Sequence, residues 1–288
     1  MITYTRAKKY QHKYLFFFAL LALISLQSKA QGDLLIYPKR VVFEGAKRSY
    51  TLNLANSGRD TVRYLISVVQ VRMSAHGAFE NITQPDPGQN FAIKYFRFFP
   101  RSIILAPNEA QSVKIQLVNT SELAPGEYRS HIYFRAEPDK RPLGEEAIAG
   151  DSTSISVNLV AVFGISIPVI IRIGESTTNV NLTDAEFELK EGSIPSLKIT
   201  FNRSGNMSAY GDVAVDHISE QGKITRVGMA KGMALYTPNL FRHFKLTLDN
   251  NMGVDYHQGK LRITYTTQAD AKSAKIAGTE LELNNNSK

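Results

Sequence analysis

The chain has 288 residues, a length that suits two domains of ordinary size. It contains no cysteine, which excludes disulfides, zinc–thiolate sites and thiol nucleophiles. Its formal net charge is +8, but five of the 34 basic residues and none of the 26 acidic residues lie in the first 30, so the remainder carries only +3, too little to suggest nucleic-acid binding.

Residues 1–30 have the pattern of a secretory signal peptide. Basic residues between 6 and 13 precede an apolar run at 15–26, and small residues flank Lys29. The run is too short to span a bilayer comfortably, so a membrane anchor is the weaker alternative. We therefore expect an exported mature chain that begins at Gln31, has no integral membrane segment after signal removal, and resides in a bacterial periplasm, where a cysteine-free protein fits.

Short β-strands separated by turns account for most of residues 31–173. In the segment 49–56 apolar residues alternate with polar ones, and the segment ends at a turn cluster, 56–58. Further strands are expected at 64–72, 96–105, 111–118 and 128–136. Residues 137–152 are polar and rich in turn formers, which predicts a long mobile loop. Strands at this spacing are typical of a β-sandwich.

From residue 174 the strand pattern restarts and predicts a second, smaller sandwich. Its strands are expected at 185–189, 196–201, 211–218, 224–229, 241–248 and 260–266. Residues 268–288 lack apolar periodicity and are interpreted as a polar tail. The sequence thus predicts an all-β fold with a signal peptide at 1–30, a first sandwich domain at 31–173, a second at 174–267 and a tail at 268–288.

Signals of catalysis are weak along the whole chain. The five histidines after the signal peptide show no metal-ligand spacing, and no nucleophile elbow, phosphate loop or dinucleotide fingerprint occurs. The segment 249–255 resembles a calcium loop but lacks the acidic residue that would close the cage. Carboxylates are too dispersed to nominate an acid–base pair. We therefore expect a protein that is not an enzyme and uses neither metal nor cofactor.

The most informative segment is the β-prone run 153–172. Its odd positions form one apolar row, which begins with Ile155, Val157, Leu159, Ala161 and Phe163. One interpretation is an ordinary strand whose apolar row fills its own core. The other is an edge strand that keeps the row available for a partner chain, an arrangement that proteins normally avoid because it invites strand pairing. The same edge would also allow the protein to associate with itself.

Four segments of the first half occur in an order and spacing that point to one family. They are 38–56, which contains Arg40, then 99–115 with its prolines, 123–135, and the run that ends at Arg172. Together they resemble the periplasmic chaperones of chaperone–usher pilus assembly, over roughly residues 34–173. The resemblance implies two immunoglobulin-like domains set at an angle, with a binding groove between them.

The resemblance also implies roles for particular residues. The last strand of the first domain would complete an unfinished pilus subunit, with Leu159, Ala161 and Phe163 at the donor positions and Ile155 and Val157 as their extension. The implied partners are secreted pilus-type subunits and an outer-membrane usher.

Two further residues match charged positions of the family. Arg40 matches the arginine that holds the terminal carboxylate of the subunit, a task that suits a planar, always charged guanidinium. Arg172 matches the arginine of a buried interdomain ion pair.

At two positions the chain departs from the family pattern. The second anchoring base of the family, a lysine, aligns with Pro168, which can neither hold a carboxylate nor donate a backbone hydrogen bond. The glutamate expected to pair with Arg172 aligns near Arg129. These departures indicate a divergent member or a changed client.

The sequence favours a periplasmic chaperone that binds subunits by strand donation. The main alternative is a structural or adhesive cell-surface protein whose immunoglobulin-like domains serve as spacers or binding modules, and a hydrolytic enzyme is a distant third. An apolar groove beside an open strand edge would favour the chaperone, whereas a fully covered strand would favour the spacer.

Overall fold

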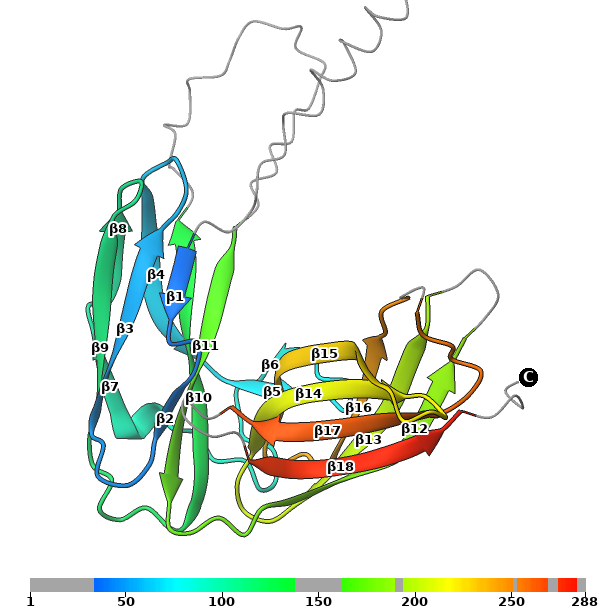
Figure 1. The fold of residues 1–288 in the computed structure, drawn as a ribbon. Coiled ribbons are helices and arrows are strands. Elements are labelled where there is room, and N and C mark those ends of the chain that lie inside the picture. The colour runs from blue at the N-terminus through cyan, green and yellow to red at the C-terminus, as the bar shows by residue number, and fades with distance from the viewer. Residues whose placement is uncertain (1–33, 138–161, 190–193, 251–252, 269–273, 284–288) are drawn as a thin grey trace, which may run out of the picture.

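The computed structural model describes residues 34–137, 162–189, 194–250, 253–268 and 274–283. They form two β-sandwiches that meet at an angle, one upright and one lying on its side in the view of Figure 1. The predicted fold class, all-β with two immunoglobulin-like sandwiches, is confirmed. In the described part of the chain, no helix has the length and apolar character needed to cross a membrane.

The first sandwich, called domain 1, packs a four-stranded sheet on a five-stranded sheet. The four-stranded sheet contains, in spatial order, β1 (Leu34–Tyr37), β3 (Ser49–Asn56), β9 (Ala110–Leu117) and β7 (Phe96–Phe99). The five-stranded sheet contains β2 (Val41–Phe43), β11 (Gly164–Ile173), β10 (Gly126–Glu137), β4 (Val62–Val69) and β8 (Ser102–Leu105). Alternate residues of both sheets point inwards and form one apolar core, in which Phe43, Leu52 and Phe134 are fully buried.

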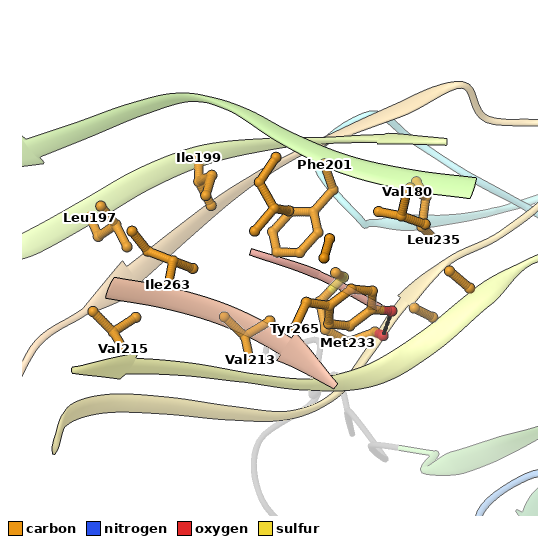
Figure 2. Packing of buried hydrophobic residues seen from close by; sticks show 14 of the residues in the cluster. Val180, Leu197, Ile199, Phe201, Val213, Val215, Met233, Leu235, Ile263 and Tyr265 are labelled. Atoms are coloured by element: carbon orange, nitrogen blue, oxygen red, sulfur yellow. Dashed lines mark hydrogen bonds between the residues drawn. The ribbon is translucent and has the colours of Figure 1, made fainter. Parts of the chain in front are cut away.

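The second sandwich, domain 2, packs a three-stranded sheet on a four-stranded one. The first contains β12 (Asn179–Glu188), β13 (Ser196–Ser204) and β16 (Phe241–Thr247), and the second contains β15 (Ile224–Leu235), β14 (Ala209–Ile218), β17 (Lys260–Thr267) and β18 (Lys275–Glu282). Figure 2 shows Phe201 of β13 facing Val213 and Tyr265 of the other sheet. The buried Tyr265 hydroxyl donates to the Met233 carbonyl at 2.9 Å, which satisfies this polar group inside the apolar core.

A short hairpin of β5 (Val71–Met73) and β6 (Phe79–Asn81) belongs to neither sandwich and lies at the inner corner between them (Figure 1). Met73 packs into the core of domain 2. The Met73 carbonyl accepts a hydrogen bond from Asn239 Nδ2 at 2.6 Å, and the Ala75 carbonyl accepts one from the His243 amide at 2.7 Å. The hairpin therefore ties domain 1 to domain 2. A single 3₁₀ turn, η1 (Ile93–Tyr95), precedes β7.

Two strands predicted as continuous are each divided in the structure. The predicted strand 64–72 breaks at Gln70, where β4 ends and the hairpin begins. The predicted strand 96–105 is β7 and β8, which pair with β9 and β4 respectively and so lie in opposite sheets. In both cases the buried residues change from even to odd positions, as from Phe98 to Ile103, because the chain turns to another sheet.

The predicted tail at 268–288 is wrong for its middle part, because Lys275–Glu282 forms β18 and pairs with β17 along its length. Ala277 and Leu283 are buried in the core of domain 2. This strand contains glycine and alanine and has few large apolar side chains, so its sequence lacks a clear alternation. The loop expected at 137–152 lies outside the described residues, except for Glu137 at the end of β10.

Candidate functional site

Among the described strands, β11 has a neighbour along its whole length on one side and a short neighbour on the other. β10 pairs with it from Gly164 to Ile173, whereas β2 pairs with it in parallel only at Val169–Ile171. At Gly164–Pro168 the side facing away from β10 has no strand partner among the described residues. We call this side of β11 the open edge.

The register shows which backbone groups the open edge presents. The Ala136 amide donates to the Phe163 carbonyl at 3.0 Å, so the odd residues of β11 direct their backbone groups towards β10. The backbone groups of Gly164 and Ser166 therefore point to the open edge. Pro168, the next residue in this series, has a carbonyl but no amide hydrogen. An extended chain lying beside the open edge can thus hydrogen-bond to Gly164 and Ser166.

A groove of about 570 Å³ lies between the open edge and β1. Its walls are largely apolar and include Leu34, Ile36, Leu54, Ala55, Ile165 and Ile167. On the β1 side Leu35 and Tyr37 are 59% and 72% exposed. We call this hollow the edge groove. It places exposed apolar surface next to backbone groups that no described strand pairs with, a combination that folded proteins rarely leave uncovered.

The odd-numbered row of β11 leaves the core as it approaches the open edge. Ile171 and Val169 are buried in the core of domain 1, Ile167 is 3% exposed, Ile165 is half-buried and Phe163 is 42% exposed. Of the five candidate donor residues, Phe163 therefore lies at the exposed end of the row. The other four, Ile155, Val157, Leu159 and Ala161, lie outside the described residues.

At its other end β11 enters the contact between the domains, here called the junction. Arg172 is the cross-strand partner of Glu127 on β10, and the Arg172 Nε lies 3.3 Å from Glu127 Oε2. Arg172 Nη2 also donates to the Ser208 carbonyl of domain 2 at 2.8 Å. The Ser208 amide donates to Glu127 Oε2 at 3.0 Å, and the Ser208 hydroxyl donates to the other carboxylate oxygen. Arg172 thus has an acidic partner, Glu127, which also binds domain 2. This glutamate lies two residues before Arg129, the position near which the family resemblance had placed it.

Arg40 lies between β1 and β2 and also belongs to the junction. Its guanidinium carbon is 4.4 Å from the ring centroid of Tyr210 and 5.3 Å from that of Tyr236, both in domain 2. Its Nη1 donates to the Tyr236 hydroxyl at 3.0 Å. Its Nη2 is buried and has no hydrogen-bond partner among the described residues.

Besides Glu127, β10 contributes two further junction residues that were not among the predicted site residues, Arg129 and His131, each 2% exposed. The Arg129 guanidinium carbon lies 4.3 Å from the Tyr236 ring centroid, and its Nη2 donates to the Thr237 carbonyl at 3.3 Å. Arg129 Nε and Nη1, like His131 Nδ1, have no hydrogen-bond partner in the described part of the chain.

The junction carries more positive than negative charge. Within the described ranges no ion pair joins Arg40 or Arg129 to an acidic side chain, and the buried Glu127 already binds Arg172 and Ser208. Burial lowers the pKa of Arg129. Burial, aided by the charges of Arg129 and Arg40, lowers the pKa of His131 to about 3, so His131 is neutral at physiological pH. Such a place attracts an anion.

The sequence did contain a signal for these residues. In β10 the polar residues Glu127, Arg129 and His131 occupy odd positions, and apolar residues occupy most of the even ones. This pattern is typical of a strand with one wet face. The signal was missed because periodicity cannot reveal that domain 2 covers this face. No group of three His, Asp or Glu side chains close enough to hold a metal ion occurs within the described ranges.

No protein-family model matches the chain, and neither does any curated protein. Among solved structures, the chain is similar to the YadV chaperone, with 13% identity and a TM-score of 0.42 over 88% of this chain and 100% of that one. It is also similar to the Pseudomonas aeruginosa CupB2 chaperone, with 13% identity and a TM-score of 0.43 over 86% and 100% of the two chains.

A third similar structure is a chain of the Salmonella enterica SafA pilin in complex with the SafB chaperone, with 13% identity and a TM-score of 0.41 over 89% and 99%. Each of these three structures contains a chaperone, and the third also contains a pilin.

Proposed function

We propose that this protein is a periplasmic chaperone that binds pilus- or fimbrial-type subunits by strand donation and delivers them for assembly at the cell envelope. The observation that carries the proposal is the open edge of β11, where the backbone groups of Gly164 and Ser166 have no strand partner among the described residues and lie beside the apolar edge groove. A sandwich with no binding task would be expected to cover this edge.

Strand donation explains why the row of apolar side chains emerges from the core. Backbone hydrogen bonds at the open edge align the guest strand, and the side chains supply affinity. The proposed donor residues continue the row beyond Ile165 and are Ile155, Val157, Leu159, Ala161 and Phe163. Burying each large side chain in a subunit contributes roughly 1.5–3 kcal/mol, so three or four of them offset much of the cost of association. Strand donation needs neither metal nor cofactor.

The junction supports the same function in two ways. The ion pair between Arg172 and Glu127, with its bonds to Ser208, holds the two domains at a fixed angle around the corner that a subunit would occupy. Arg40 is proposed as the anchor for the subunit's terminal carboxylate, because its Nη2 has no partner in the described part of the chain and a guanidinium can bind both carboxylate oxygens. An outer-membrane usher would then receive the subunit.

One observation favours a second candidate, a structural or adhesive protein with immunoglobulin-like spacer domains. Ile167, Val169 and Ile171 are buried in the core of domain 1, as they would be in an ordinary strand. A spacer would make no use of the open edge, so the two functions differ in what a change at this edge does.

The decisive experiment is Ser166→Pro, with Ser166→Ala as its matched control. Proline at 166 removes one amide donor from the open edge and leaves the hydrogen bonds between odd residues and β10 intact. We expect the variant to unfold at nearly the wild-type temperature but to co-purify at least tenfold less secreted subunit from its native envelope. Ser166→Ala should retain the subunits, identified by mass spectrometry as incomplete β-sandwich chains.

Phe163→Asp gives an independent arm at the exposed end of the donor row. The side chain is 42% exposed, so the fold should tolerate the charge, whereas the apolar surface of a bound subunit should not. Undiminished subunit capture by both Ser166→Pro and Phe163→Asp would refute strand donation and favour the spacer.

A further inference from the structure

We propose that Arg129 is the second cation of the carboxylate site and binds the terminal carboxylate of the guest chain together with Arg40. This inference rests on the proposed function. It names a residue on β10 for a task that the residue at 168 of β11, a proline, cannot perform.

The register places Arg129 on the required face. Pro168 has His131 as its direct cross-strand partner, and the next pair on the same face is Ile170 with Arg129. Directly opposed residues of an antiparallel pair project from the same side of the sheet. The face on which a basic residue at 168 would lie is therefore supplied with a cation by the neighbouring strand.

Arg129 and Arg40 meet around one aromatic ring. Their guanidinium carbons lie 4.3 Å and 5.3 Å from the ring centroid of Tyr236, although the residues come from different strands of domain 1. Within the described ranges, each guanidinium donates one hydrogen bond to domain 2, Arg129 to the Thr237 carbonyl and Arg40 to the Tyr236 hydroxyl. The remaining donors are available to a ligand.

The free donors point to an anion as that ligand. Arg40 Nη2, Arg129 Nε and Arg129 Nη1 are buried and have no hydrogen-bond partner among the described residues. Buried donors without acceptors are costly, and two like charges at one place repel each other. A carboxylate supplies two acceptor oxygens and a compensating charge, whereas a neutral amide supplies neither the charge nor the second strong acceptor.

A guest chain would reach the site by displacing the side chain of Phe79. This ring, on β6 of the hairpin, is 53% exposed and lies 5.7 Å from His131 and 6.1 Å from Tyr236, measured between ring centroids. Ring packing is the contact that holds it over the two residues, so its displacement breaks no hydrogen bond. An apolar side chain therefore packs beside the site at the inner corner of the molecule.

The test uses the full-length mature protein and a pair of peptide probes. One probe is an acetylated octapeptide of alternating valine and threonine that ends in a free carboxylate, and the other is its C-terminally amidated twin. Calorimetry gives the ratio of the two affinities for wild type, Arg40→Ala, Arg129→Gln and Arg129→Lys. Arg203→Gln is the matched control, because Arg203 is also a buried arginine, but its Nε and Nη1 donate to the carbonyls of Asn239, Gly205 and Met207.

We expect wild type and Arg203→Gln to bind the carboxylate probe at least tenfold more tightly than the amide. Arg40→Ala and Arg129→Gln should reduce this ratio towards one, and Arg129→Lys should restore part of it by keeping the charge. The carboxylate probe alone should raise the pKa of His131, followed by NMR, because an anion offsets the neighbouring charges. A merely structural Arg129 would leave the ratio and this pKa unchanged.

Each other outcome overturns the inference. An unchanged ratio in Arg129→Gln removes Arg129 from the site, and failure of wild type to distinguish the probes removes the site itself. Sodium acetate binding as tightly as the peptide would mean that a free carboxylate, and not a chain terminus, is the ligand. The ratio is measured within one variant, so loss of stability does not mimic it. Failure of strand donation is scored separately, by Ser166→Pro.

Discussion

The two ends of β11 have opposite environments within a single strand. From Val169 to Ile171 it is bonded on both sides, and its side chains alternate between two cores, with Ile171 in that of domain 1 and Ile170 in that of domain 2. From Gly164 to Pro168 its one strand partner in the described part of the chain is β10, and it borders the edge groove. The difference teaches that one strand can anchor the angle between the domains at one end and offer backbone and apolar surface at the other.

The change between these two ends occurs at Pro168. The residue lacks an amide hydrogen, so it cannot extend the ladder that β2 begins at Val169. Gly164 and Ser166 each present both an amide hydrogen and a carbonyl at the open edge, whereas Pro168 presents a carbonyl alone. We call the part of β11 from Val169 onwards, with the junction, the sealed end, and Gly164–Pro168 the open end. A substitution at the sealed end should change the free energy of unfolding, whereas one at the open end should change binding alone.

The largest effect is expected at the sealed end, from Glu127→Ala. The substitution leaves Arg172 without its buried partner and removes the acceptor of two hydrogen bonds from Ser208. Breaking a buried ion pair in this way costs about 3–5 kcal/mol of the free energy of unfolding. Urea denaturation measures it.

Glu188→Ala is the comparison variant for Glu127→Ala. Glu188 pairs with Lys198 and Lys245 at the surface of domain 2, where solvent screens the charges. Its removal should change the urea midpoint far less. Equal shifts for the two variants would mean that the junction does not depend on its buried carboxylate.

The position opposite Pro168 makes the stability depend on pH. His131 has a pKa of about 3 in the folded protein, against about 6.5 in an unfolded chain. Between these values the unfolded state binds the additional proton, so stability should fall as the pH is lowered from 6.5 towards 3. The slope is at most about 1.4 kcal/mol per pH unit.

His131→Gln should remove this part of the pH dependence, because glutamine does not titrate. Urea denaturation at several pH values measures the slope for both proteins. The same slope in the variant would show that other groups cause the acid sensitivity, and that His131 is not held neutral between Arg129 and Tyr236.

The sequence contains more information about the open end of β11 than about its sealed end. The row of apolar residues at odd positions is visible in the sequence because the strand has a period of two, although the sequence leaves open whether the row fills its own core or stays exposed. The two sandwiches follow from the same periodicity. The sealed end depends on contacts between residues far apart in the chain, such as Arg40 with Tyr236, which no local pattern contains.

The errors in strand assignment have a common physical cause. β4 and β7 bury even residues and the strands after them, β5 and β8, bury odd ones, because the chain passes to a different sheet between them. All four segments are apolar enough to be interpreted as continuous strands. β18 was missed for the opposite reason, since its pairing with β17 needs little apolar surface of its own. Periodicity reports a local conformation and not the sheet to which a strand belongs.

The smallest effect on stability, and the sharpest separation of the two ends, is expected in the edge groove from Leu35→Ser. Leu35 is 59% exposed on the outer face of β1 and lines the groove. Truncating an exposed side chain usually changes stability by no more than about 0.5 kcal/mol. If a guest strand lies in the groove, however, Leu35 becomes buried on binding, and the variant should capture subunits several-fold less well.

Ile104→Ser is the matched control for Leu35→Ser. Ile104 is 51% exposed on β8, at the far edge of the five-stranded sheet, and does not line the groove. Both variants should unfold at the wild-type urea concentration, and only Leu35→Ser should lose subunits in co-purification. Equal capture by the two variants would mean that a side chain contributes the same whether or not it borders the open edge. The guest strand would then lie elsewhere. The open end of β11 would in that case be an unprotected edge without a binding role.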